Sequence, residues 1–232
     1  IALLFVVFGL MLVLGVPVAF ALAAASLATL LYLDVPSIVM VQQVSAGSGS
    51  ASLIAIPLFI FAGEIMLRGG ISERLIGLAS SLVGRMRGGL GQVSILSSLF
   101  FGGVSGSALA DVSAVGGTMI PQMVKRGYDR DFAVNVCITA ALVALLVPPS
   151  HNLILYSAAA GGGLSIADLF AAGIVPALLM TAVLMFTCYA VARHRGYGVE
   201  IFPGWRAVAL RLVSALPGLG LVALIFVGIR AG

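Results

Sequence analysis

Two short polar stretches interrupt long apolar runs, and their residue types can bind an ion or a small solute. Residues 102–107 form the first stretch, Gly-Gly-Val-Ser-Gly-Ser, and residues 148–152 form the second, Pro-Pro-Ser-His-Asn. Together they offer hydroxyls, an amide and backbone carbonyls, which are oxygen ligands suited to Na⁺, and N–H donors suited to a carboxylate. We therefore predict that Ser105 and Ser107 contribute to a Na⁺ site.

An interrupted membrane helix is a good source of such groups. Inside a bilayer, backbone N–H and C=O groups freed by a break must find partners within the protein or in what it binds. The first turn of each half-helix also directs a positive dipole end toward the break. The predicted substrate- and ion-binding residues are Gly103, Ser105, Gly106, Ser107, Asp111, Pro149, Ser150, His151 and Asn152. The alternative is that these glycines and serines only allow close helix packing.

Two titratable residues in or near the breaks have competing interpretations, and a third lies near the end of an earlier apolar segment. Asp111 is a functional candidate because an ionisable group in a membrane is costly, although it could instead cap a helix. His151 could carry a proton, or it could be a neutral hydrogen-bonding residue that steadies its break. Glu64 precedes Arg68 by four residues, and we predict an i,i+4 ion pair between them.

Two other functions compete with that of a solute carrier. Residues 103–106 match the GxSG pattern of rhomboid-type intramembrane serine proteases, with His151 as a potential partner of Ser105. A match this short is weak in a glycine-rich chain, and the AHxxG pattern of that family's histidine helix is missing. A Na⁺/H⁺ antiporter of similar architecture is the other alternative. We predict a carrier that is not an enzyme and needs no cofactor beyond the coupling ion.

The composition identifies the setting in which these breaks occur. The chain is 61% hydrophobic and 9% charged, whereas soluble domains carry roughly 25% charged residues. Its apolar stretches are apolar all round, which predicts an all-α polytopic membrane protein in the lipid bilayer. The basic residues form short clusters between apolar runs, a positive-inside pattern and not a nucleic-acid surface. Cys137 and Cys188 lie within apolar segments, and we expect both to be buried.

The long apolar runs are expected to divide into three regions. Residues 1–87 should form scaffold helices and an interfacial arm, and residues 164–232 further transmembrane helices. Between them lies a transport region of residues 88–163. Because the run 1–33 is longer than a bilayer requires, it must tilt, kink at Pro17 or split into two helices.

The transport region is predicted to contain a re-entrant hairpin over 88–124 and a broken helix over 128–163. Basic residues flank 88–124 on both sides, which places both ends in the cytoplasm. Two full spans would do the same but need roughly 40 residues plus a turn, so the shorter hairpin is favoured.

Several motifs, in order along nearly the whole chain, resemble the large membrane subunit of tripartite ATP-independent periplasmic (TRAP) transporters, the DctM-like family. They are Gly15–Leu22, Ile56–Glu64, Arg68–Leu75, Phe101–Ala108 with Asp111, Ile120-Pro121, Lys125–Tyr128, Pro148–Ser150 and Ala172–Pro176. Family members are about twice as long, so the resemblance implies the N-terminal half, the first of two inverted repeats.

The resemblance also implies a mechanism and partners. It implies an elevator-type carrier in the bacterial inner membrane, driven by a Na⁺ gradient. A small DctQ-like membrane subunit and a periplasmic DctP-like substrate-binding protein are the implied partners, and the usual substrates are dicarboxylates, keto acids or sugar acids. Residues 143–147 and His151-Asn152 depart from the family's commoner residues at positions expected to face the site. We predict a substrate of the sugar-acid or keto-acid type.

Overall fold

The computed structural model describes residues 1–49, 51–160, 164–200 and 203–231 of the chain. Within these ranges the secondary structure consists of helices joined by turns, which confirms the predicted all-α class. The contacts between residues divide the chain into two units, Ile1–Ile54 and Ala55–Gly232. Each unit is described separately below.

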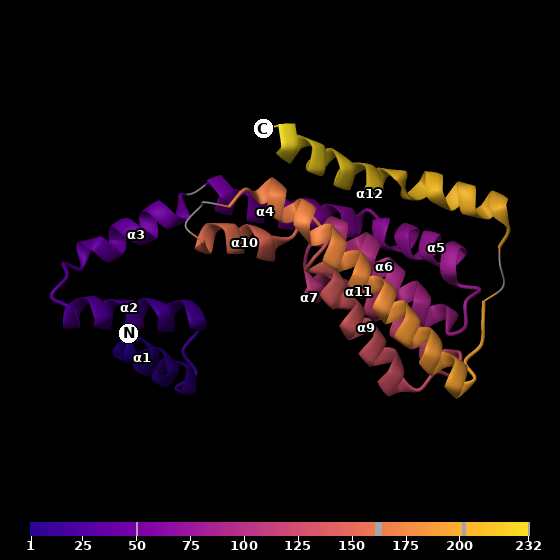
Figure 1. Ribbon diagram of the computed structural model, residues 1–232, viewed down its shortest axis with the longest axis horizontal. Coiled ribbons are helices and arrows are strands. Elements are labelled where there is room, and N and C mark those ends of the chain that lie inside the picture. Colours follow the sequence, from indigo (N-terminus) through magenta and orange to yellow (C-terminus); the bar gives the residue numbers. More distant parts are fainter. Residues whose placement is uncertain (50, 161–163, 201–202, 232) are drawn as a thin grey trace. The chain divides into compact units, whose positions relative to one another are not determined.

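The first unit contains α1 (Ala2–Val13), α2 (Val18–Tyr32) and α3 (Ile38–Ser48). The apolar run 1–33 therefore splits in two, because Gly15 adopts a positive φ of 77° and Pro17 precedes the first turn of α2. A proline is well tolerated there, since its missing N–H has no partner to lose. The two helices pack against each other as a hairpin (Figure 1).

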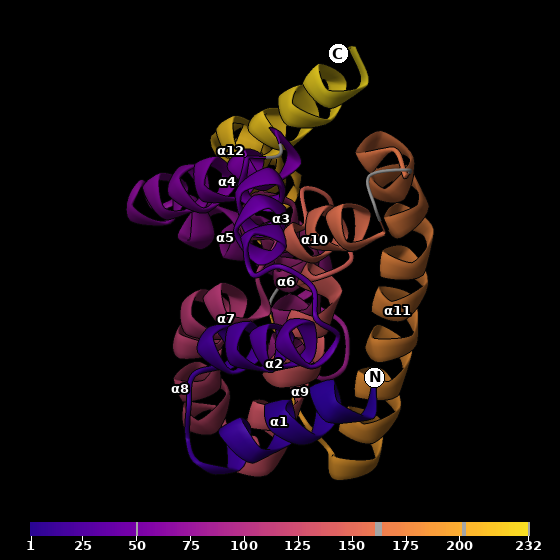
Figure 2. The same ribbon diagram turned by 90° about the vertical axis from the view of Figure 1, so that its left-hand side faces the viewer.

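In the second unit, α5 (Ile71–Val83) is packed between two longer helices. It contacts α6 (Gly89–Ser105) on one side and α12 (Trp205–Ala231) on the other; α12 runs alongside α5 in Figure 1 and lies above it in Figure 2. Its buried residues, Ser72, Leu75, Leu78, Ala79 and Ser81, recur at helical spacing. α5 is thus an amphipathic helix with one buried face, and the position of the predicted arm at a membrane interface stays a prediction.

The chain reverses direction after α6. Gly106 takes a left-handed conformation, and α7 (Ala108–Asp111), a π-helical turn (Val112–Gly116) and α8 (Gly117–Lys125) return against α6. Ser107 begins this return by accepting a hydrogen bond from the Ala110 N–H, at 3.4 Å. Residues 88–124 therefore form a helical hairpin whose turn is the glycine- and serine-rich stretch.

The second polar stretch also interrupts a helix. The first piece, α9 (Arg130–Ala144), packs extensively against α6, and the second, α10 (His151–Ala159), begins after six residues outside any helix. The peptide bond between Pro148 and Pro149 is cis. The predicted discontinuous helix is thus present, although residues 161–163 of the predicted range lie outside the described residues.

The helix α11 (Ile166–Arg195) is capped by Ser165, whose hydroxyl accepts a hydrogen bond from the Asp168 N–H at 3.3 Å. It packs against α6 and α9, where the Gln92 amide donates to the Met185 carbonyl at 2.8 Å. Cys137 and Cys188 are buried in this part of the core. Within the described residues, α11 and residues Trp205–Leu224 of α12 are helices long and apolar enough to cross a membrane.

Candidate functional site

The turn of the hairpin lies directly against the break between α9 and α10. A Cβ atom added at Gly106 would overlap the Pro149 carbonyl oxygen and come within 3.0 Å of Ser150 Cα. At Gly103, an added Cβ would lie 3.4 Å from the Pro148 carbonyl oxygen. Gly106 also has a positive φ of 56°, which L side chains rarely adopt. The two polar stretches predicted from the sequence therefore meet, and glycine is required where they touch.

Both predicted serines of the hairpin turn have hydroxyls engaged locally. Ser105 Oγ donates to the Ser107 carbonyl oxygen at 3.4 Å and accepts from the Ser107 N–H at 3.3 Å. These distances lie at the long end of the range for hydrogen bonds, so the bonds are weak. A hydroxyl held this loosely can turn toward an arriving ion at little cost.

A pocket of about 190 Å³ opens beside the turn. Its lining comes from α4 (Ala51–Arg68), the hairpin and α10, and consists of Ile60, Gly63, Glu64, Leu67, Phe101, Ser105, Ser107, Ala110 and His151. Four of these side chains are polar, namely Glu64, Ser105, Ser107 and His151. A ligand here would meet two hydroxyls, a carboxylate and an imidazole.

The break between α9 and α10 contributes few side chains to the pocket and shapes the site chiefly through its backbone. Pro149 and Ser150 are buried, and Ser150 Oγ donates to the Leu145 carbonyl at 2.5 Å instead of capping α10. Asn152 is exposed and does not line the pocket. Of the four residues predicted from this stretch, only His151 lines the pocket with its side chain.

Asp111 lies behind the pocket wall. It is 1% exposed, and its Oδ2 accepts a 2.7 Å hydrogen bond from Ser98 Oγ on the opposite arm. Oδ1 is buried without a hydrogen-bond partner among the described residues. The alternative role as a helix cap does not apply, because Ser107 caps α7 and Asp111 makes no cap bond. Asp111 therefore joins the two arms of the hairpin.

Glu64 is a pocket residue that sequence reasoning assigned to another role. The predicted ion pair is present, with Arg68 Nε 3.0 Å from Glu64 Oε1, and both side chains are largely exposed. Glu64 nevertheless lines the pocket with Ser105 and Ser107, about forty residues further along the chain. No sequence spacing indicates a contact between segments this far apart.

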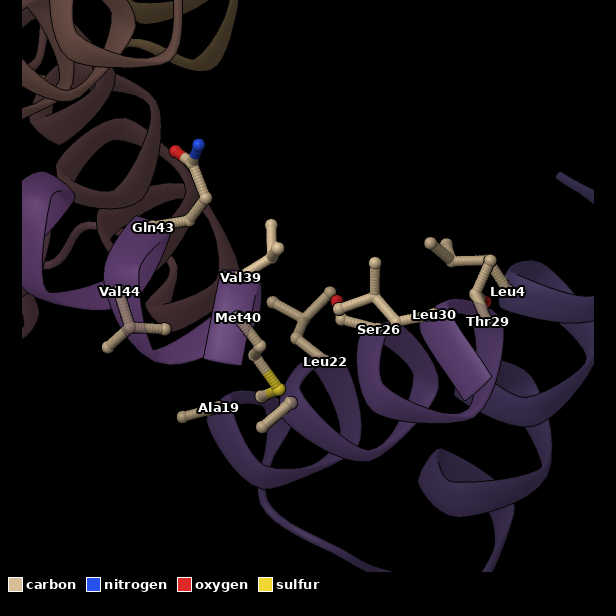
Figure 3. Close-up of a pocket in the computed structure, with 11 residues that line it drawn as sticks. Leu4, Ala19, Leu22, Ser26, Thr29, Leu30, Val39, Met40, Gln43 and Val44 are labelled. Atoms are coloured by element: carbon tan, nitrogen blue, oxygen red, sulfur yellow. The ribbon is translucent and has the colours of Figure 1, made fainter. Parts of the chain in front are cut away.

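A more voluminous pocket lies in the first unit and is of a different kind. It measures about 570 Å³, and its walls come from α1, α2 and α3 (Figure 3). Most of its lining is aliphatic, and the Thr29 hydroxyl already donates to the Ala25 carbonyl at 2.7 Å. It contains none of the predicted site residues. The smaller polar pocket is the candidate site because it combines residues of both interrupted segments with polar side chains.

A comparison with protein families identifies the chain. Residues 5–232 match the family described as "Tripartite ATP-independent periplasmic transporter, DctM component". The chain belongs to this family.

Curated relatives agree with this assignment. The chain is 37% identical over its whole length to the C4-dicarboxylate TRAP transporter large permease protein DctM of Vibrio cholerae, of which it covers 51%. It is 36% identical over 94% of its length to the 2,3-diketo-L-gulonate TRAP transporter large permease protein YiaN of Escherichia coli, again covering 51%. The ectoine TRAP transporter large permease protein TeaC of Halomonas elongata is 40% identical over 83% of this chain, which covers 45% of it.

The chain thus spans about half the length of the curated relatives it matches. Membership of the DctM family makes it part of a membrane permease and does not favour the protease or antiporter alternatives. The geometry also speaks against the protease alternative, because Ser105 and His151 are not hydrogen-bonded to each other. Ser105 Oγ is bonded to the Ser107 backbone, and His151 Nε2 has no hydrogen-bond partner in the described part of the chain.

Proposed function

We propose that this chain forms part of the permease of a Na⁺-coupled secondary transporter that imports an organic acid delivered by a periplasmic binding protein. The contact of Gly106 with Pro149 and Ser150, beside a polar pocket, is the observation that carries the proposal. Two interrupted helices that meet beside a pocket offer backbone dipoles and carbonyls to a charged ligand. The proposed setting is the bacterial inner membrane, crossed several times, with a small DctQ-like membrane subunit as second partner.

In this proposal, Na⁺ is held at the hairpin turn. The hydroxyls of Ser105 and Ser107 and nearby backbone carbonyls would replace part of the hydration shell of the ion. Asp111, buried behind the turn and bonded to Ser98, would add negative charge without direct contact. A buried carboxylate with one unpartnered oxygen favours a cation nearby.

The proposed mechanism is alternating access of the elevator type. The hairpin and the broken helix, residues 88–163, would move as one body because α6 and α9 share an extensive interface. We place α11 with this body, since it packs against both helices, and α12 with the scaffold, since it packs chiefly against α5. Residues 1–87 would supply the remaining scaffold and the arm that joins the two.

Overall sequence identity to these relatives does not identify the substrate of this chain. The relatives are named for a C4-dicarboxylate, 2,3-diketo-L-gulonate and ectoine, yet their identities to this chain fall between 36% and 40%. The class proposed here is therefore an organic acid, and side chains in the pocket must decide which.

The test measures the uptake of labelled organic acids by cells that express the full-length permease together with its proposed partner proteins. Wild-type uptake should require a Na⁺ gradient, and Ser105→Ala should raise the half-saturating Na⁺ concentration at least about fivefold, a loss of about 1 kcal/mol. Ser165→Ala is the matched control, because it removes a serine that caps a helix away from the pocket. An unchanged Na⁺ requirement in Ser105→Ala would remove the ion site from the proposal.

A further inference from the structure

His151 has an unsatisfied polar atom at the candidate site. Its imidazole lines the pocket beside the hairpin turn, and its Nε2 atom is buried with no hydrogen-bond partner among the described residues. A buried polar atom without a partner costs about as much as a lost hydrogen bond. A ligand atom that bonds to Nε2 would recover this cost.

Glu64 lines the same pocket and restricts which ligand atom can serve. Its carboxylate accepts hydrogen bonds only, and Arg68, its ion-pair partner, is largely exposed and is not part of the pocket lining. An additional carboxylate on the ligand would be repelled by Glu64. An aliphatic CH₂ group would satisfy neither side chain.

A hydroxyl group fits both requirements. It donates one hydrogen bond, which Glu64 can accept, and its oxygen accepts bonds, which a neutral imidazole N–H can provide. Ser105 and Ser107 add further hydroxyl partners in the same pocket. At about 190 Å³ the pocket is smaller than a typical drug-sized site, so it suits the hydroxylated part of a small acid.

We propose that His151 and Glu64 select hydroxylated organic acids over acids of the same carbon chain that lack hydroxyl groups. This inference rests on the proposed function, because it assigns the substrate class of the same site. His151 acts as a specificity-determining residue, and Na⁺ coupling is left to the hairpin turn. Sites built to bond a substrate hydroxyl discriminate strongly against analogues that lack it, since their own polar groups are then left unpaired.

The experiment measures ligand affinity on the purified, intact permease in detergent, so that the binding protein does not impose its own preference. Ligand-dependent thermal stabilisation gives the dissociation constant. The probes are two pairs, tartrate against succinate and gluconate against adipate. Within the first pair the acids differ only in hydroxyl groups. Each titration is run in Na⁺ and in choline at equal ionic strength.

We expect wild type to bind at least one hydroxylated acid about tenfold or more tightly than its partner. His151→Leu should abolish this preference, and His151→Gln should keep most of it, because an amide also donates and accepts. Glu64→Gln should reduce the discrimination against adipate. His194→Leu is the matched control, since His194 is exposed at the end of α11 and away from the pocket. It should bind as wild type does.

The outcomes separate the inference from the proposed function. Na⁺-promoted binding of succinate or adipate without any preference for hydroxyl groups overturns the inference and leaves the proposed function standing. The same holds if His151→Leu weakens both members of a pair equally. If no acid binds in either salt, both are overturned. If a hydroxylated acid binds equally well in Na⁺ and choline and the preference is lost in His151→Leu, the inference stands and Na⁺ coupling fails.

Discussion

Ser97 and Ser98 are neighbours on α6 with equal burial and different partners. Both are 0% exposed, but Ser98 Oγ donates to Asp111, whereas Ser97 Oγ has no partner among the described residues. Ser98→Ala should therefore cost about 1–2 kcal/mol, because it leaves the Asp111 carboxylate without its donor. Ser97→Ala should be neutral or slightly stabilising.

Thermal unfolding of the two variants in detergent measures this difference directly. Only Ser98→Ala should unfold at a lower temperature than wild type. Equal destabilisation by both substitutions would contradict the assignment of Asp111 as the residue that joins the hairpin arms.

Gly106 offers a second test at the level of a single residue. Gly106→Ala places a Cβ against the Pro149 carbonyl at a positive φ, so we expect destabilisation of more than about 1 kcal/mol and loss of transport. Gly117 is the matched control. It has a helical φ of −56° and open space around its Cβ position, so Gly117→Ala should be neutral or stabilising. A folded, active Gly106→Ala variant would argue against the close contact of turn and break.

For single residues, the sequence predicts which residue types form the site but not every residue that lines the pocket. The glycines and serines of residues 102–107 mark a break because they interrupt a long apolar run. The sequence predicts only the local pair of Glu64 with Arg68, since the hairpin residues that share a pocket with Glu64 lie far along the chain. Asn152 is predicted for its amide, but successive residues of a helix point in different directions, and Asn152 is exposed.

Among the elements, the turn between α8 and α9 is held by a group of aromatic residues that we call the aromatic clasp, Tyr128, Phe132 and Tyr197. The Tyr197 ring lies 4.3 Å from that of Tyr128 and 5.2 Å from that of Phe132, centroid to centroid. Its hydroxyl donates to Asp129 Oδ2 at 2.8 Å, and Arg195 pairs with the same oxygen at 2.5 Å. The clasp thus joins the start of α9 to the segment that follows α11.

The aromatic contacts should matter more than the ion pair. Tyr197→Ala removes two ring contacts and the hydrogen bonds of the Tyr197 hydroxyl to Asp129 and Arg195, an expected loss of about 2–3 kcal/mol. Arg195→Ala removes an ion pair whose side chains are 46% and 64% exposed, a long hydrogen bond to Tyr197 and a contact with the Phe132 ring at 5.8 Å, and its expected cost is about 1 kcal/mol. Hydrogen exchange of the amides of residues 126–132 should accelerate far more in Tyr197→Ala. Similar acceleration in both variants would show that the ion pair holds the turn.

Most helices can be predicted from hydrophobic runs and from the glycines and prolines that end them. For residues 1–33 the sequence left several arrangements open, and the packing of α1 against α2 decides between them. The run 1–33 allowed a tilted, kinked or split helix, and Gly15 and Pro17 permit all three. Contact between α1 and α2 favours the split, because each helix then covers part of the other. The π-helical turn after Asp111 had no indication in the sequence, since its residues 112–116 are ordinary helix formers and glycine.

For the whole molecule, the main prediction is that both ends of the hairpin, residues 88–124, face the cytoplasm. Cysteines introduced at the exposed positions Arg87 and Lys125 should react with a membrane-impermeant thiol reagent only from the cytoplasmic side. A cysteine at Ser165 should react only from the other side. The buried native cysteines keep the background low.

The tip of the hairpin separates a re-entrant hairpin from two full spans. Leu109 is 83% exposed near the tip. A re-entrant hairpin predicts that Leu109→Cys reacts much more slowly than Ser165→Cys from the outside, because the tip stays at membrane depth. Equal reaction rates would mean that residues 88–124 cross the membrane twice.

The central claim is that the pocket between the hairpin turn and the broken helix binds Na⁺ and the transported acid together. Ala110 lines this pocket, whereas Gln122 lines a separate one, so Ala110→Cys and Gln122→Cys form a matched pair. The most direct measurement is the alkylation rate of each cysteine in membranes, in Na⁺ or choline at equal ionic strength, with and without the acid. We predict that Na⁺ and the acid together slow alkylation at Ala110→Cys severalfold and leave Gln122→Cys unchanged. Equal rates at Ala110→Cys in all four conditions would contradict the account.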